Sequence, residues 1–136
     1  MADLLIVDDD PDVCEVLGDS LRSEGHVVRV ARDGLEGWEA LDERLPDVVL
    51  LDVEMPRLSG PAMAYRMFLR DAGLEQVPII LLSGRMNLSE IAASVGTHYY
   101  LTKPYPFANV LALLKQALHE RRAPQPQPRA VDASSR

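Results

Sequence analysis

Cysteine is nearly absent from this sequence, with Cys14 the single one among 136 residues. One cysteine excludes an internal disulfide and a cysteine cluster for a metal. Cys14 falls on the apolar face of a predicted helix, so we interpret it as core packing rather than as a nucleophile.

Long apolar runs and basic surfaces are also missing. No run reaches the roughly 18 residues of a membrane span, and Asp3 precedes the first apolar run, so no leader peptide is expected. The chain has 14 Lys and Arg against 21 Asp and Glu, which argues against direct binding to nucleic acid. We expect a cytoplasmic protein without a membrane segment.

The chain is organised around residues 48–56. A run of four apolar residues ends at Asp52, and Pro56 follows, which cannot donate a hydrogen bond to a sheet. The pattern predicts a strand buried on both faces, with Asp52 at its carboxyl end. Open α/β sheets bind ligands at that edge. The alternative for Asp52 alone is a turn-capping residue.

Strand and helix patterns alternate along the chain. Strands are predicted over 3–7, 27–31, 48–51, 77–82 and 99–101. Helices are predicted after Asp10, Asp33 and Ser59, near Leu88, and over 107–122. This alternation requires a parallel sheet with right-handed crossovers and helices on both faces. We predict an α/β fold of the flavodoxin-like (βα)5 type, with strand order 2-1-3-4-5.

In that strand order, the carboxyl ends of four strands meet in one crevice. They bring together Asp8, Asp9, Asp52, Ser83 and Lys103. Three carboxylates repel one another unless a cation joins them, and Mg²⁺ accepts few carboxylates together with waters and phosphate oxygens. A carboxylate nucleophile beside a metal, an ammonium group and a hydroxyl indicates phosphoryl transfer onto Asp52.

From about Asp3 to about Arg122, the chain resembles the receiver domain of bacterial two-component response regulators. Each motif that carries the resemblance stands at the end of a predicted strand. The motifs are residues 5–11 (LIVDDDP), 51–56 (LDVEMP) with Gly60, 82–84 (LSG) and 96–104 (GTHYYLTKP). One such motif is weak evidence, but the ordered set is specific.

The resemblance implies a role for each residue of the crevice. Asp52 would accept a phosphoryl group from a histidine kinase or a phosphotransfer protein. Asp9, Asp52 and the backbone carbonyl of Glu54 would hold Mg²⁺, and Asp8 would act mainly through water. Lys103 would hold the phosphoryl group.

The resemblance also implies a switch. Ser83 would turn toward the phosphoryl group and Tyr100 would follow inward, which would reshape the surface of the fourth helix, the fifth strand and the fifth helix. The Lys103–Pro104 bond is expected to be cis, as X-Pro chemistry permits. The segment from Ser83 to Tyr100 is shorter than usual for the family, so we expect a short fourth helix.

Glu54 and Arg85 each stand two residues after a crevice residue, Asp52 and Ser83 respectively. We predict that they form an ion pair at the mouth of the crevice and gate the water that hydrolyses the aspartyl phosphate. The alternative is two independent solvated charges.

The implied function is signalling, with self-phosphorylation from small phosphodonors and autodephosphorylation as the only catalysis. The implied partners are the phosphodonor protein, a downstream target or output domain, and a second copy of the chain. One alternative is a haloacid-dehalogenase-like phosphatase, but such enzymes carry an aspartate where this chain has Glu54. Another is a degenerate receiver that works without phosphate, against which the full acidic set and Lys103 argue.

The composition changes after Arg122. Residues 124–128 alternate proline and glutamine without an apolar pattern. We predict a receiver domain over 1–122 and a disordered Pro/Gln-rich tail or linker stub over 123–136. As a linker stub, it would mark this chain as the receiver part of a longer regulator with a missing output domain.

Overall fold

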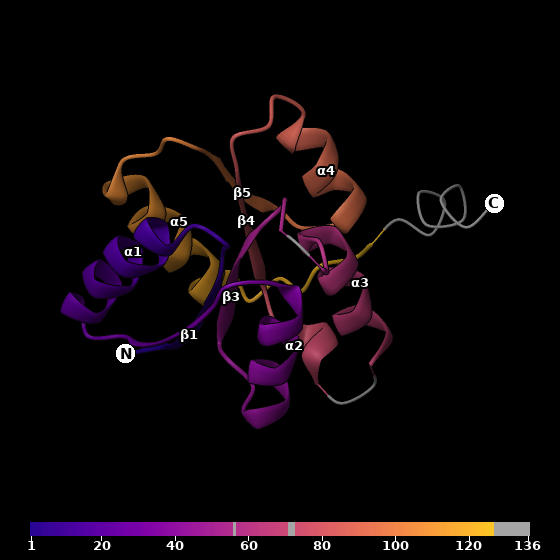
Figure 1. Ribbon diagram of the computed structural model, residues 1–136, viewed down its shortest axis with the longest axis horizontal. Helices are drawn as coiled ribbons and strands as arrows, with labels where there is room; N and C mark the ends of the chain where they lie inside the picture. Colours follow the sequence, from indigo (N-terminus) through magenta and orange to yellow (C-terminus); the bar gives the residue numbers. More distant parts are fainter. Residues whose placement is uncertain (56, 71–72, 127–136) are drawn as a thin grey trace.

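The computed structural model describes residues 1–55, 57–70 and 73–126 (Figure 1). The strands are β1 (Asp3–Val7), β2 (Val27–Ala31), β3 (Val48–Asp52), β4 (Ile79–Ser83) and β5 (Tyr99–Thr102). The α-helices are α1 (Pro11–Ser23), α2 (Gly34–Glu43), α3 (Gly60–Leu69), α4 (Leu88–Val95) and α5 (Phe107–Glu120), with a short 3-10 helix η1 (Leu74–Gln76) before β4. Among the residues described, no helix is long and apolar enough to cross a bilayer.

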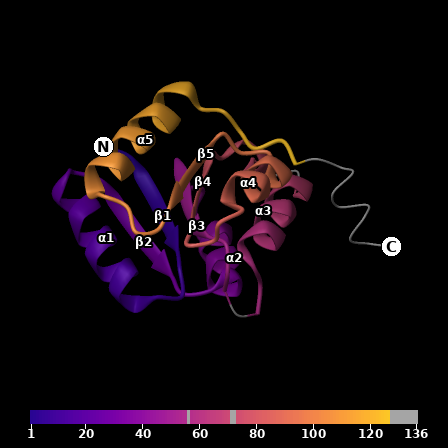
Figure 2. The same ribbon diagram turned by 90° about the horizontal axis from the view of Figure 1, so that it is seen from above.

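All neighbouring strands pair in parallel, in the order β2-β1-β3-β4-β5. Helices α1 and α5 cover one face of the sheet, and α2, α3 and α4 cover the other (Figure 2). Alternate residues of the central strand β3 enter the two cores, as Leu50 and Leu51 do. The predicted fold class and strand order are therefore confirmed.

Polar caps start three of the helices where the sequence predicted them. Asp10, Asp33 and Ser59 each accept a hydrogen bond from a backbone N–H in the first turn of α1, α2 and α3. Pro11 occupies the first position of α1, where no N–H is needed. These caps set where each chain segment leaves the carboxyl edge of the sheet.

Two boundaries differ from the prediction by two residues, and the ends of β3, β4 and β5 each lie one residue later than predicted. Helix α5 ends at Glu120 rather than at residue 122, because Arg121 adopts a left-handed conformation with φ 57°. Strand β4 begins at Ile79 rather than at Val77, because the N–H of Val77 closes the turn of η1 by donating to the carbonyl of Leu74. Helix α4 is short, as expected, with eight residues.

After α5 the chain crosses the amino edge of the sheet toward the end of α4 (Figures 1 and 2). Pro124 is buried, and the backbone N–H of Gln125 donates to the carbonyl of Gly96 at 2.9 Å. The domain boundary at residue 122 and the disorder beyond it stay predictions. Of the predicted tail, residues 123–126 follow this path, and residues 127–136 lie outside the described residues.

Candidate functional site

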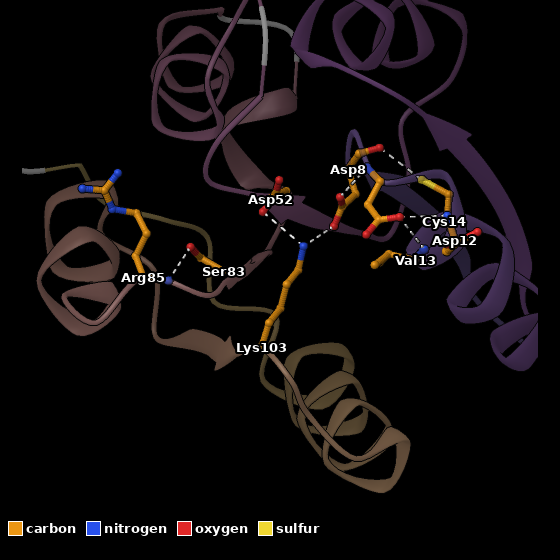
Figure 3. A network of polar contacts seen from close by, with 9 residues as sticks. Asp8, Asp12, Val13, Cys14, Asp52, Ser83, Arg85 and Lys103 are labelled. Carbon is orange, nitrogen blue, oxygen red and sulfur yellow. Dashed lines mark hydrogen bonds and ion pairs between the residues drawn. The ribbon is translucent and has the colours of Figure 1, made fainter.

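A crevice at the carboxyl edge of the sheet collects the polar ends of four strands (Figure 3). Asp8 follows β1, Asp52 ends β3, Ser83 ends β4 and Lys103 follows β5. The parallel register holds these ends level, since Asp52 pairs with Leu82 in the neighbouring strand. Parallel strand pairing therefore brings the predicted site residues to one place.

Three carboxylates converge in this crevice. Oxygen atoms of Asp8, Asp9 and Asp52 lie within 4.8 Å of one another. Asp8 is fully buried, Asp52 is 6 % exposed, and Asp9 is open to solvent. The Lys103 ammonium lies between two of them, with Nζ 2.8 Å from Asp8 Oδ2 and 3.4 Å from Asp52 Oδ1. One ammonium thus faces three carboxylates.

This imbalance appears in the pKa values of the crevice. Burial, and then the charge of Asp8, raise the pKa of Asp52 from 3.8 to about 6, although Lys103 acts in the opposite direction. Burial tends to lower the pKa of Lys103, but its hydrogen bond to Asp8 and the charges of both carboxylates outweigh burial and raise that pKa. A further cation would relieve the repulsion that destabilises ionised Asp52.

The donor set fits Mg²⁺. The converging groups are carboxylate oxygens, which hard divalent cations prefer, and the exposure of Asp9 leaves room for the waters that Mg²⁺ retains. The predicted ligands Asp9 and Asp52 are both members of this cluster. Glu54, whose backbone carbonyl is the third predicted ligand, lies in the loop that follows β3.

Cys14 contacts the backbone of a crevice residue. Its thiol lies 3.1 Å from the backbone carbonyl of Asp8, to which it donates. Burial, and then the charge of Asp8, raise the pKa of Cys14 to about 11. A thiol with so high a pKa is a poor nucleophile, in agreement with its interpretation as core packing. Its bond to Asp8 could not be predicted from the sequence.

The predicted switch residues lie on neighbouring strands. The Ser83 hydroxyl accepts a hydrogen bond from the backbone N–H of Arg85 at 3.1 Å, so it is engaged with the loop after β4 (Figure 3). Tyr100 is 41 % exposed. The backbone N–H of Lys103 donates to the carbonyl of Ser83 at 2.8 Å and ties the two strands at the crevice. Lys103–Pro104 is cis, as expected.

Glu54 and Arg85 form the ion pair that their spacing predicted. Arg85 Nη1 donates to Glu54 Oε1 at 2.5 Å, and the side chains of Arg85 and Glu54 are 49 % and 64 % exposed. The pair joins the loop after β3 to the loop after β4. Its effect on hydrolysis stays a prediction.

A second ion pair beside the crevice was not predicted. Arg57, in a left-handed conformation with φ 67°, donates to the Asp33 carboxylate, with Nε–Oδ2 at 3.0 Å. The pKa of Asp33 is lowered, first by a hydrogen bond from the backbone N–H of Glu36 and further by Arg57. Burial acts in the opposite direction but does not cancel these effects. The contact fastens the loop after Asp52 to the start of α2. The sequence identified Asp33 as a cap, but nothing in it marked Arg57 as the partner.

Comparison with known proteins agrees with this geometry. The family model described as the response regulator receiver domain matches residues 4–115. A similar curated protein is the response regulator MprA of Mycobacterium sp. (strain KMS), 39 % identical over 127 residues. That alignment covers 92 % of this chain and 54 % of MprA, so the chain spans about half the length of the curated relatives it matches.

Solved structures show the same fold. The receiver domain of NtrX from Brucella abortus aligns with a TM-score of 0.77 and 29 % identity, covering 86 % of this chain and 98 % of that one. The chemotaxis response regulator CheY4 of Vibrio cholerae aligns with a TM-score of 0.80 and 26 % identity, covering 87 % and 99 %. None of these similarities supports the phosphatase alternative. The chain belongs to the family of response regulator receiver domains.

Proposed function

We propose that this receiver accepts a phosphoryl group on Asp52 from a histidine kinase or a phosphotransfer protein in the cytoplasm. The observation that carries the proposal is the environment of Asp52, a buried carboxylate at the end of the central strand, 3.4 Å from the Lys103 ammonium and clustered with Asp8 and Asp9.

The chemistry follows from the charges of the crevice. With a pKa of about 6, Asp52 is mostly ionised at neutral pH, so one carboxylate oxygen can attack the phosphorus of the donor. The new bond joins that oxygen to phosphorus, and the bond from phosphorus to the donor nitrogen or oxygen breaks. Lys103 Nζ lies close enough to pair with the negative charge on the transferring group.

The metal would be held by Asp9, Asp52 and the backbone carbonyl of Glu54, with Asp8 acting through water. Bound Mg²⁺ would neutralise charge on the phosphoryl oxygens. Lys103 already pairs with Asp8 and leaves the repulsion among the three carboxylates incompletely balanced. This remaining negative charge supports Mg²⁺ as the cofactor.

The signal would leave through the surface formed by α4, β5 and α5. A phosphoryl group adds roughly −1.5 to −2 charge and three strong acceptors. The Ser83 hydroxyl would exchange its bond with the Arg85 N–H for one to the phosphoryl group, and Tyr100 would then move inward from its exposed position. The downstream partner that responds to this signal is an output domain, a separate target protein or a second copy of the chain.

Receiver domains are signalling modules. We infer that the only catalysis of this chain is self-phosphorylation from small phosphodonors and autodephosphorylation, both at Asp52. The proposal that this chain is the receiver part of a longer regulator is supported by the length of the curated relatives, of which it spans about half.

Incubation with acetyl phosphate and Mg²⁺ tests the proposal directly. Intact-mass spectrometry should show one added phosphoryl group, which Asp52→Asn and excess chelator should each remove. Asp19→Asn, at an exposed carboxylate of α1, is the matched control and should be labelled like the wild type. Undiminished labelling of Asp52→Asn, or full-rate labelling without metal, would refute the assignment.

The switch has its own test. Phosphorylation should shift amide resonances from Val95 to Leu111 in the wild type, and Ser83→Ala should reduce those shifts. Equal shifts in the two proteins would show that the coupling runs by another route.

A further inference from the structure

The segment that follows α5 is fastened to the domain at several points. Arg121 turns the chain out of the helix, and its Nη1 lies 3.4 Å from Asp47 Oδ1 at the start of β3. Pro124 is buried. The backbone N–H of Gln125 donates to the carbonyl of Gly96 at 2.9 Å. The segment therefore crosses the amino edge of the sheet and reaches the end of α4.

Gly96 provides the space that this crossing needs. It ends α4 in a left-handed conformation with φ 83°, and a Cβ atom built on it would overlap the backbone of Gln125. Gly25 has a similar φ of 92°, but a Cβ atom there meets nothing within 4 Å. The two glycines share the same backbone requirement, and only Gly96 also makes room for another segment.

The place where the segment arrives is a groove on the face formed by α4 and β5. The groove has a volume of about 430 Å³. Small side chains of α4 form one wall, and the stretch that ends α4 and enters β5 forms the other; the groove is lined by Ser89, Ala92, Ala93, Gly96, Thr97, His98, Tyr100 and Gln125. Gln125 is thus the residue of the segment that contributes to the wall of this groove.

We propose that residues 123–126 are a built-in occupant of the α4–β5 face, where Gln125 forms part of the groove wall. They cover one end of the α4–β5 face, so a partner or second copy that binds there has to displace them. Tyr100 lines the same groove, so its inward movement would change the shape of the groove that Gln125 helps to form. Phosphorylation of Asp52 therefore releases the segment; this coupling rests on the proposed function, whereas the docking itself does not.

Amide hydrogen exchange on the unphosphorylated full chain tests the docking. The Gln125 amide should exchange at least about 10-fold more slowly than an unprotected amide of the same sequence, because it is hydrogen-bonded. Gly96→Ala should remove that protection, and Gly25→Ala, which imposes the same left-handed strain without reaching Gln125, should leave it.

Trypsin cleavage after Arg122 gives a second measurement. Cleavage there should be several-fold faster in Gly96→Ala than in Gly25→Ala. Pro124→Ser keeps both glycines and should give the same acceleration by weakening the buried contact. A Gln125 amide that exchanges at the unprotected rate in the wild type would overturn the docking.

Acetyl phosphate with Mg²⁺ tests the release. In chains whose mass confirms phosphorylation, Gln125 protection should fall several-fold, with no change in Asp52→Asn. A phosphorylated chain with unchanged protection would overturn the release. A chain that gains no phosphoryl group while Gln125 stays protected would refute the proposed function and leave the docking in place.

Discussion

The two edges of the sheet both gather carboxylates and cations, but in opposite proportions. At the carboxyl edge, Asp8, Asp9 and Asp52 face the single ammonium of Lys103. The result is a raised pKa at Asp52. This edge retains negative charge that a metal ion can balance.

The amino edge has the reverse balance. Asp3 accepts from Arg44 at 2.5 Å and lies 3.8 Å from Arg29. Asp47 accepts from the backbone N–H of Asp3 at 2.7 Å and faces Arg121 at 3.4 Å. Two carboxylates thus meet three guanidinium groups. A carboxylate cluster therefore indicates a reactive site when its charges are left unbalanced, and a structural role when cations and N–H groups satisfy it.

Removing one cation at each edge should give the largest contrast in stability. Lys103→Met leaves the fully buried Asp8 without its cationic partner, and in metal-free buffer at neutral pH we expect a loss of about 3 kcal/mol in the free energy of unfolding. Arg121→Met removes an exposed partner and should cost about 1 kcal/mol or less. Urea unfolding of both variants measures the difference, and equal losses would remove the distinction between the edges.

Removing the Asp52 carboxylate should raise the free energy of unfolding rather than lower it. The pKa of Asp52 is about 6 in the folded protein and 3.8 ordinarily, so the folded state binds the proton more tightly. Stability should therefore fall as pH rises from about 4 to about 6 and level off above, by roughly 2–3 kcal/mol. Asp52→Asn lacks this penalty, so in metal-free buffer it should be more stable than the wild type at pH 7.5 and equal to it near pH 4.

Chemical denaturation across that pH range provides the measurement. Mg²⁺ should reduce the difference in stability between Asp52→Asn and the wild type at pH 7.5, because it stabilises the ionised wild-type crevice. If the free energy of unfolding depends on pH in the same way in the two proteins, ionisation of Asp52 does not destabilise the folded state.

The carboxyl edge could be predicted from the sequence because short apolar strands end there in polar residues. Parallel pairing then forces Asp8, Asp52, Ser83 and Lys103 together. The amino edge could not be predicted in this way. The pairing of Asp47 with Arg121 joins two loop residues that follow no periodic pattern, and the partner is set by where α5 ends.

Asp47→Asn tests whether the amino edge affects stability alone. The substitution weakens the bond to the Asp3 N–H and the attraction to Arg121, so we expect a loss of about 1 kcal/mol in stability. Labelling by acetyl phosphate should not change. A reduced labelling rate would mean that the amino edge also controls the site.

The smallest effect is expected at the mouth of the crevice. The exposed Glu54–Arg85 pair is worth at most about 1 kcal/mol, so Glu54→Ala or Arg85→Ala should shorten the phosphoryl lifetime by no more than roughly fivefold. If the pair gates hydrolytic water, the double mutant should resemble either single mutant. Decay of the added mass after donor removal gives the lifetimes, and single mutants with unchanged or longer lifetimes would exclude the gate.

The shortness of α4 has a consequence for the energetics of the surface it forms. Its eight residues span about 12 Å, and its buried side chains are Leu88, Ala92 and Val95. Among the described residues, the Asn87 side chain caps no backbone N–H at its start. So little buried surface and a start without a side-chain cap give α4 a low free energy of local opening. A signal worth only a few kcal/mol is then enough to redistribute this helix between alternative positions, while the sheet beneath it keeps its register.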